Sequence, residues 1–278
     1  MPNPESLSAR RSSGIASRIA VVTALLLLLV LLTLPLLGLV FRVSPVRLLA
    51  RLGDPAIIDA LQLSLITSLS ATIVVIIIGL PAAYLLARRE FRGKRLVEAL
   101  IDLPMVLPPT VAGLALLLAL GRNGLAGSTL GFLGIQLPFT TLGVIVAQVF
   151  MAVPFFIGPA RAGFASVDQR LLDAATTLRA SESFRFYRVM VPLALPSLLA
   201  GAAMSCARAL GEFGATITFA GNLPGLTQTM PLAVYDAMQS DLEAAITMAV
   251  LLTVMALGLL LALRQAPALL QRSLRAPR

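Results

Sequence analysis

The sequence predicts an all-α integral membrane protein with about six transmembrane helices. Of its 278 residues, 58% are hydrophobic and only 13% are charged, and the mean hydropathy is +0.92. A soluble domain has no interior large enough to bury that much apolar surface. Several uncharged runs also reach the roughly 20 residues that a helix needs to cross a bilayer. Composition and run length together therefore define the fold class.

The expected spans are the longest runs without charge. They are 19–41, 60–87, 103–121, a run from about residue 140 within 123–160, 189–210 and 244–263. The run 213–235 is also uncharged, but glycines and prolines interrupt it repeatedly. We therefore expect a helix end there, followed by a loop or a re-entrant segment that does not span the membrane.

The distribution of Arg and Lys predicts the orientation in the membrane. If the N-terminus is cytoplasmic, 17 of the 22 cationic residues lie in inside segments and four lie outside, with Arg208 inside a span. This bias follows the positive-inside rule, so both termini are expected in the cytoplasm. The expected organisation is a cytoplasmic tail (1–18), a first transmembrane helix (19–41), a core of five helices (57–263) and a basic cytoplasmic tail (264–278).

The longest inside segment, 161–192, has the pattern of two short amphipathic helices. Leu171, Ala175 and Leu178 recur at helical spacing, and Phe184, Tyr187 and Val191 repeat the pattern. Asp168, or Ser166 paired with Gln169, would cap the first helix. Such a pair would either lie on anionic lipid headgroups or dock into a groove of a soluble partner.

The residue inventory argues against an enzyme. Histidine is absent and cysteine occurs once, which leaves no Ser/His/Asp or Cys/His nucleophile set and no cysteine-based metal site. No G-x-x-x-x-G-K-[ST] motif is present, so the chain has no phosphate cradle for ATP. Because the net charge of +9 follows the topology, we expect contact with membrane lipid and none with nucleic acid.

Segment 173–192 resembles the EAA loop of ABC importer permeases. It keeps the alanine pair, the spacing and the final proline of that pattern, but has Asp173 for Glu, Arg179 for Gly and Val191 for Leu. The family glycine lies at the turn between two coupling helices, so Arg179 must adopt a strained conformation or close the turn differently. The resemblance implies that the following residues contact a separate ATPase: Asp173, Ala174, Ala175, Leu178, Arg179, Phe184, Tyr187, Val189 and Pro192.

Two further segments, "LPMVLPPTVAGLALLLALGRNG" (103–124) and "ARALGEFGATITFAGNLPGLTQTMPLAVY" (207–235), resemble the permease subunits of molybdate importers. Phe213, Ala215 and Thr216 favour this branch over the sulfate permeases. The resemblance implies the type I ABC importer permease fold, a homodimer, two copies of an ATPase that binds ATP and Mg²⁺, and an extracytoplasmic oxyanion-binding protein. It implies no cofactor on this chain. Tungstate, and sulfate or thiosulfate, remain alternative substrates.

Several residues in the expected spans are candidates for the translocation path or gate. Those expected from the sequence are Arg208, Glu212, Phe213, Thr216, Ser64 and Thr67. Isolated charges are unfavourable in a span, so Arg208 and Glu212, four residues apart, form either a structural ion pair or part of the anion pathway. The hydroxyls of Ser64 and Thr67 would either line the path or join helices.

The motif LPMVLPP suggests a hinge at the inner end of the third span, formed by Pro104, Pro108 and Pro109. The alternative is a helix that is merely kinked at its start. An ion-coupled secondary transporter is a less favoured function, because the sequence shows neither internally repeated halves nor a buried acidic or histidine relay. A membrane scaffold would leave the spacing of the 161–192 segment unexplained.

Overall fold

The computed structural model describes residues 4–44, 46 and 50–275, and the side chains of residues 18–44, 46, 50–262 and 265 among them. The described residues form helices and turns, with no β-strand. The chain divides into two units, Met1–Ala50 and Arg51–Arg278. Five of the described helices are long and apolar enough to cross a membrane, and a bent pair of helices brings the number to six if it counts as one span. The predicted all-α membrane fold is thus confirmed.

The first unit contains helix α1, Pro4–Phe41. Its apolar part, Arg18–Phe41, has 24 residues, which at 1.5 Å per residue gives about 36 Å and exceeds the thickness of the hydrocarbon core. The helix ends at the residue predicted for the first span. The predicted cytoplasmic tail is helical from residue 4 to residue 18, and residues 1–3 lie outside the described part of the chain.

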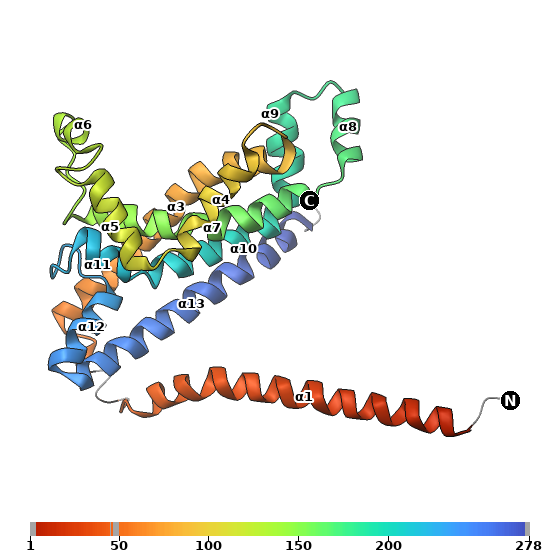
Figure 1. Cartoon of the computed structure of the whole chain (residues 1–278), viewed down its shortest axis with the longest axis horizontal. Coiled ribbons are helices and arrows are strands. Elements are labelled where there is room, and N and C mark those ends of the chain that lie inside the picture. Colours follow the sequence, from red (N-terminus) through yellow and green to blue (C-terminus); the bar gives the residue numbers. More distant parts are fainter. Residues whose placement is uncertain (1–3, 45, 47–49, 276–278) are drawn as a thin grey trace. The chain divides into compact units, whose positions relative to one another are not determined.

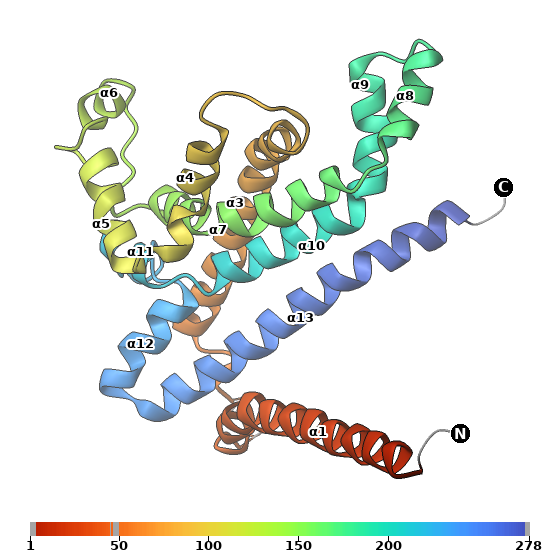
Figure 2. The same cartoon turned by 45° about the vertical axis from the view of Figure 1, so that its right-hand side comes forward.

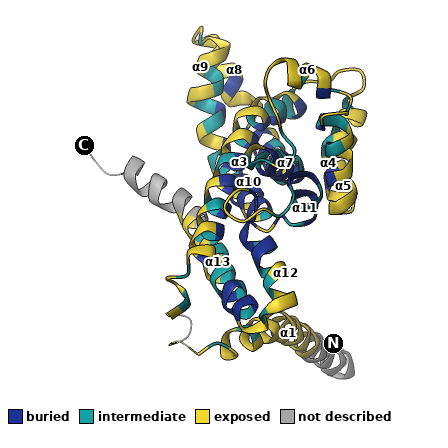
Figure 3. Cartoon of the chain, turned by 90° about the vertical axis from the view of Figure 1, so that its left-hand side faces the viewer, coloured by how far each residue is buried: buried dark blue, intermediate teal, exposed yellow. Residues whose placement is uncertain are grey.

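The core of the second unit consists of α3 (Pro55–Arg88), α7 (Thr141–Ala165) and α10 (Val191–Leu210). Helix α7 packs along both α3 and α10 (Figure 1). The contact is close because small residues surround the buried ring of Phe156. A Cβ added to Gly79 would lie 2.7 Å from that ring, and one added to Gly201 would lie 3.0 Å from the Phe156 carbonyl oxygen. Small residues allow helices in a membrane to approach in this way. The buried residues concentrate where these helices meet (Figure 3).

The fifth span begins earlier than the predicted residue 189. Helix α9 (Glu182–Arg185), a π-helical turn η1 (Phe186–Met190) and α10 form one continuous helix, Glu182–Leu210. In the π-turn, the N–H of Val191 donates to the carbonyl of Phe186, five residues earlier. Pro192 has no N–H to continue the α-helical ladder, which explains why the helix widens at this position.

The third predicted span, 103–121, is broken by a sharp bend in the structure. Helix α4 (Lys94–Val106) and helix α5 (Pro109–Leu120) meet at an angle of 119°. Leu107 adopts an extended conformation with ψ of 134°, because the residue before a proline is driven out of the α-region. Pro108 and Pro109 therefore end one helix and start another, instead of only kinking a single helix. The chain here turns back within a broken span or a re-entrant loop.

Helix α5 packs against α11 (Gly214–Ala220) through glycines. A Cβ on Gly113 would lie 2.7 Å from the carbonyl oxygen of Ala215, and one on Gly214 would lie 2.6 Å from Cβ of Pro109. The short helix α6 (Gly127–Phe132) lies in the Gly-rich segment before α7. The predicted interruption of 213–235 is confirmed, since α11 ends at a glycine and α12 (Met230–Ser240) begins after a loop.

Helix α13, Leu242–Arg275, packs against α10 and α12. It contains the predicted sixth span and continues through the predicted tail to residue 275, while residues 276–278 lie outside the described part. Asp241 caps α13 by accepting from the N–H of Ala244 at 3.0 Å, and Arg51 donates to the same side chain at 3.1 Å. The Ala244 N–H and the Arg51 guanidinium lower the pKa of Asp241.

Candidate functional site

The predicted amphipathic pair is present at one end of the second unit, where helices α8 and α9 stand apart from the core helices (Figures 1 and 2). Helix α8 comprises Gln169–Thr177. Asp168 caps it by accepting from the N–H of Arg170 at 2.9 Å. The hydroxyl of Ser166 instead donates to the carbonyl of Gly163. Of the two predicted capping residues, Asp168 and not Ser166 therefore caps α8. Ser181 caps α9 through the N–H of Phe184.

Arg179 lies in the turn between α8 and α9 with a φ of 57°. This is the left-handed region, which glycine enters freely and which costs other residues about 1–2 kcal/mol. The N–H of Arg179 donates to the carbonyl of Thr176, and that of Ala180 donates to the carbonyl of Ala175, so the turn closes the end of α8. Of the two predicted possibilities, the structure shows the strained conformation.

The apolar side chains of this segment point in two directions. Leu172 and Met190 are buried at 7% and 2% exposure, and hold α8 and the π-turn to the core cluster. The predicted stripe faces outward instead: Leu178 is 83% exposed, and the other outward apolar side chains are Leu171, Phe184 and Tyr187. We call these four residues the apolar ridge. An ordered segment with this much exposed apolar surface is typical of an interaction site.

The remaining predicted contact residues lie around the ridge. Asp173 and Ala174 are exposed, and the carboxylate of Asp173 accepts from Gln169 at 3.0 Å. Ala175 and Val189 are half-buried, and Val189 packs on the core cluster. Pro192 is exposed at the start of α10. The structure therefore places Val189 nearer to the core than to the outer surface of the loop.

An aromatic cluster fastens the segment to the core. The ring of Tyr84 on α3 lies 5.9 Å from that of Phe164 on α7 and 5.0 Å from that of Phe186 in the π-turn. Both contacts are edge-to-face, a favourable arrangement for aromatic rings. The cluster joins three helices directly beneath the ridge.

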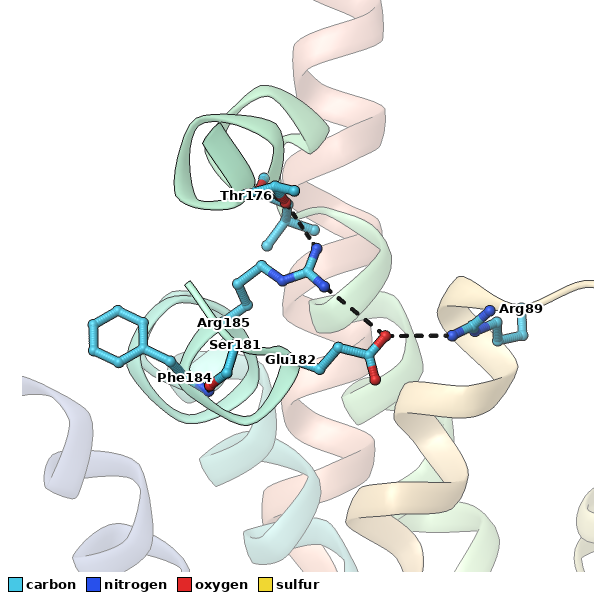
Figure 4. A network of polar contacts seen from close by, with 7 residues as sticks. Arg89, Thr176, Ser181, Glu182, Phe184 and Arg185 are labelled. Atoms are coloured by element: carbon cyan, nitrogen blue, oxygen red, sulfur yellow. Dashed lines mark hydrogen bonds and ion pairs between the residues drawn. The ribbon is translucent and has the colours of Figure 1, made fainter. Parts of the chain in front are cut away.

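A polar network reinforces the same attachment. Arg88, at the end of α3, donates to the carbonyl of Val167 at 2.7 Å and to the amide oxygen of Gln169 at 3.3 Å. Figure 4 shows the carboxylate of Glu182 between Arg89 and Arg185, with oxygen–nitrogen distances of 3.8 Å and 3.9 Å. Arg185 also donates to the hydroxyl of Thr176 at 2.8 Å, which joins α9 to α8. Motion of the α3 end would therefore move the ridge.

The sequence analysis missed the residues of this attachment. Tyr84, Arg88, Phe164 and Phe186 come from three separate parts of the chain, and no local pattern links them. Phe186 lies two residues from Phe184 and so falls on another side of the helix. The available signal was the cluster of arginines that ends the second span at residues 88 and 89, which was interpreted only as a mark of topology.

Arg208 and Glu212 form an ion pair near the end of α10. The nitrogen–oxygen distance is 2.5 Å, and the carboxyl side chain is only 1% exposed. Glu212 also accepts from the N–H of Ala215 at 2.8 Å, at the start of α11. The guanidinium of Arg208 lies 6.0 Å from the ring centre of Phe155 on α7. The pair thus connects α10, α11 and α7, which is what a structural ion pair would do.

The other residues predicted to line the translocation path are Phe213, Thr216, Ser64 and Thr67, and most of them are buried inside this chain. Phe213 stacks obliquely on Tyr235, with ring centres 5.1 Å apart, and Thr216 is fully buried. Ser64 and Thr67 are also fully buried. Ser64 accepts from the N–H of Met230 at 2.7 Å, and Thr67 donates to the carbonyl of Leu63 within its own helix. Both hydroxyls face the interior of this chain, where Ser64 joins two elements and Thr67 bonds within its own helix, so a role in lining the path stays a prediction.

The three prolines of the predicted hinge have different positions. Pro108 and Pro109 flank the 119° bend, while Pro104 is buried inside α4, where the helix continues past it. The bend lies between helices of 13 and 12 residues. A hinge motion at Pro108 and Pro109 stays a prediction.

Comparison with known proteins places this arrangement in a class. The model of a family described as "Binding-protein-dependent transport system inner membrane component" matches residues 76–275. The chain belongs to this family and is a multi-pass inner-membrane protein. Its relatives are permease subunits, which are the non-enzymatic membrane components of ABC transport systems.

Individual relatives define the branch of the family. The chain is 40% identical over 232 residues to the molybdenum transport system permease protein ModB of Mycobacterium tuberculosis, covering 82% of this chain and 86% of the relative. It is 36% identical over 237 residues to the probable transport system permease protein NifC of Clostridium pasteurianum, covering 84% and 82%. A third relative, ModB of Escherichia coli K12, is 40% identical over 183 residues, covering 66% and 80%.

Solved structures show the same fold at low sequence identity. A bacterial ABC transporter involved in the import of alginate superposes with a TM-score of 0.73 at 14% identity, covering 94% of this chain and 98% of that one. An amino acid ABC transporter superposes with a TM-score of 0.55 at 20% identity, covering 83% and 99%. The fold is that of type I ABC importer permeases.

Substitution of the buried ion pair tests whether it is structural. Glu212→Gln leaves the guanidinium of Arg208 without its partner, and Arg208→Gln leaves a buried carboxylate, so each should destabilise the protein by roughly 3–5 kcal/mol. The double variant should recover part of that loss, because neither charge remains. Thermal unfolding of the purified protein in detergent measures these effects, with Arg122→Gln in an exposed turn as control. Additive losses in the double variant would contradict a structural pair.

Proposed function

We propose that the chain is the permease subunit of an ATP-driven importer that carries molybdate across the inner membrane. The resemblance of most of the chain to molybdenum transport permeases supports the substrate. The observation that carries the mechanism is the apolar ridge, an ordered and exposed surface fastened to the ends of α3, α7 and α10. We infer that the ridge docks into a groove on a separate ATPase.

The proposed partners follow from this role. Two permease chains form a homodimer, two ATPase subunits bind ATP and Mg²⁺ and contact the ridge, and an oxyanion-binding protein delivers the substrate from outside. A solved relative supports such an assembly, since the alginate transporter was crystallised with a periplasmic protein bound to alginate pentasaccharide. This chain holds no cofactor of its own in the proposal. Both termini lie in the cytoplasm, as the positive-inside rule requires.

The structure suggests how ATP binding reaches the membrane. Closure of the ATPase dimer would move α8 and α9, and the bonds of Arg88 and Arg185 together with the aromatic cluster would pass that motion to α3, α7 and α10. Because these three helices pack closely around Phe156, they move as a unit. The bend at Pro108 and Pro109, packed against α11, is the proposed site where the path opens and closes.

Uptake of radioactive molybdate tests the proposed substrate. Cells that lack their own molybdate uptake should accumulate molybdate when they express this chain with its ATPase and binding protein. Tungstate should compete at equal concentration, while sulfate should compete poorly, because sulfate is the smaller anion. Cells that express only the ATPase and binding protein are the control. Equal competition by sulfate would assign the chain to the sulfate or thiosulfate branch.

Substitutions in the ridge and beside it test the proposed docking. Phe184→Ala removes about 1.5–3 kcal/mol of apolar burial from the interface, which corresponds to roughly a tenfold to hundredfold weaker association. Ala175→Glu adds a bulky charge to a half-buried position and should prevent docking. Arg179→Gly relieves the positive φ and should keep or improve coupling.

Co-purification of the ATPase and molybdate uptake are measured on the same cells, and the amount of inserted permease is measured by immunoblot. Leu223→Cys, in the exposed loop at the opposite end of the second unit, is the matched control. If Phe184→Ala and Ala175→Glu keep full ATPase binding and uptake, the ridge is an element of the lipid surface and the docking proposal is wrong.

A further inference from the structure

A second site lies beside the ridge, in a cavity of about 200 Å³ between the end of α3 and helices α8 and α9. Its charged lining residues are Arg88, Arg89, Arg185 and Glu182. The apolar side chains of Leu172 and Met190 lie on its inner side, and both are buried. The cavity is much larger than a single water molecule. It is separate from the Arg208–Glu212 pair at the far end of α10.

Positive charge in this cavity exceeds negative charge. Three guanidinium groups face one carboxylate, and that carboxylate belongs to a side chain that is 79% exposed. One oxygen of Glu182 lies 3.8 Å from Arg89 and 3.9 Å from Arg185. A well-formed bond between a guanidinium and a carboxylate is about 2.7–2.9 Å long, so neither contact is close. Glu182 therefore compensates these arginines only in part.

Arg88 lines the cavity at the end of α3 and is half-buried. Within the described residues, its guanidinium donates to the neutral oxygens of Val167 and Gln169. These bonds fix the orientation of the guanidinium without balancing its charge. The hydroxyl of Thr176 fixes Arg185 in the same way. A half-buried guanidinium that is held in place but not neutralised is suited to bind an anion.

We propose that this cavity binds a tetrahedral oxyanion group. The planar guanidinium forks match the oxygens of such a group, and three of them converge from two different helices. The group would come either from the phosphate of an anionic lipid headgroup or from a free oxyanion such as phosphate, molybdate or tungstate. Basic pockets between helices at the cytoplasmic surface are known to hold lipid headgroups. The proposal does not depend on the transported substrate.

An occupied site would bridge α3 to α9 and hold the segment that carries the ridge. With the site empty, the polar connection between the end of α3 and α9 is the 3.8 Å contact of Arg89 with Glu182, beside the aromatic contact of Tyr84 with Phe186. The bound oxyanion would thus set how firmly the ridge follows the end of α3, which makes the site a candidate for regulation by lipid composition or by accumulated anion.

Binding to the full-length purified permease tests the proposal in two arms. The free-anion arm titrates sodium tungstate and sodium phosphate into the protein in a zwitterionic detergent and follows binding by calorimetry. The lipid arm embeds the protein in nanodiscs of phosphatidylcholine with phosphatidylglycerol, and counts retained lipids by native mass spectrometry. Neither arm requires uptake, so failure here is distinct from failure of the proposed transport function.

Variants with opposite expected effects make the test specific. Arg89→Gln and Arg185→Gln should each weaken binding about tenfold or more, because each removes a charge-assisted hydrogen bond. Glu182→Gln should tighten binding several-fold, because it removes the competing carboxylate; a protein that fails to fold would not bind more tightly. The matched control is Arg92→Gln, an exposed arginine outside the cavity, which should leave binding unchanged.

Each result has a defined meaning. Loss of tungstate or phosphate binding in the two arginine variants identifies a free oxyanion as the ligand, and loss of retained phosphatidylglycerol identifies a lipid headgroup. No binding in either arm would overturn the proposal. Equal effects of Arg92→Gln and Arg89→Gln, or no gain in Glu182→Gln, would overturn it as well, because binding would then reflect overall charge and not this cavity.

Discussion

Inside a bilayer, each backbone N–H and C=O must find its hydrogen-bond partner within the protein, and the architecture of this chain depends on that constraint. The long helices meet it within themselves. Beside the break, the end of α5 next to Pro108 and Pro109 packs against α11, and glycines at residues 113 and 214 allow the backbones to approach. Interior hydroxyls such as Thr67 and Thr72 bond to carbonyls of their own helix.

The same packing connects the membrane core to its outer segment. Helix α7 lies against α3 and α10, and the ends of all three meet in the cluster of Tyr84, Phe164 and Phe186. Arg88 adds bonds from α3 to the residues around the start of α8. The apolar ridge is thus an extension of the core and not a flexible loop. Force applied at the ridge would reach the interior through aromatic contacts and short hydrogen bonds, both of which resist deformation.

The features that the sequence could predict are local or compositional. Span lengths, the interruption near residue 221, the cap at Asp168 and the unusual conformation of Arg179 each depend on a few neighbouring residues. Features that depend on distant partners were missed or misjudged. Nothing local indicated that Ser64 would accept from Met230, or that Phe186 would meet Tyr84. The double proline was recognised as unusual, but nothing local indicated that α5 would pack against α11, which lies about a hundred residues later.

The central claim is that the ridge contacts the ATPase on the cytoplasmic side, and site-directed cross-linking tests it most directly. Cys206 is buried, so single cysteines can be introduced at the half-buried Ala175 beside the ridge and, as a control, at the exposed Leu223 at the other end of the second unit. In the assembled transporter, a short bifunctional thiol reagent should join position 175 to the ATPase, while an impermeant reagent added outside intact cells should label only position 223. External labelling of position 175, or no cross-link from it to the ATPase, would contradict the account.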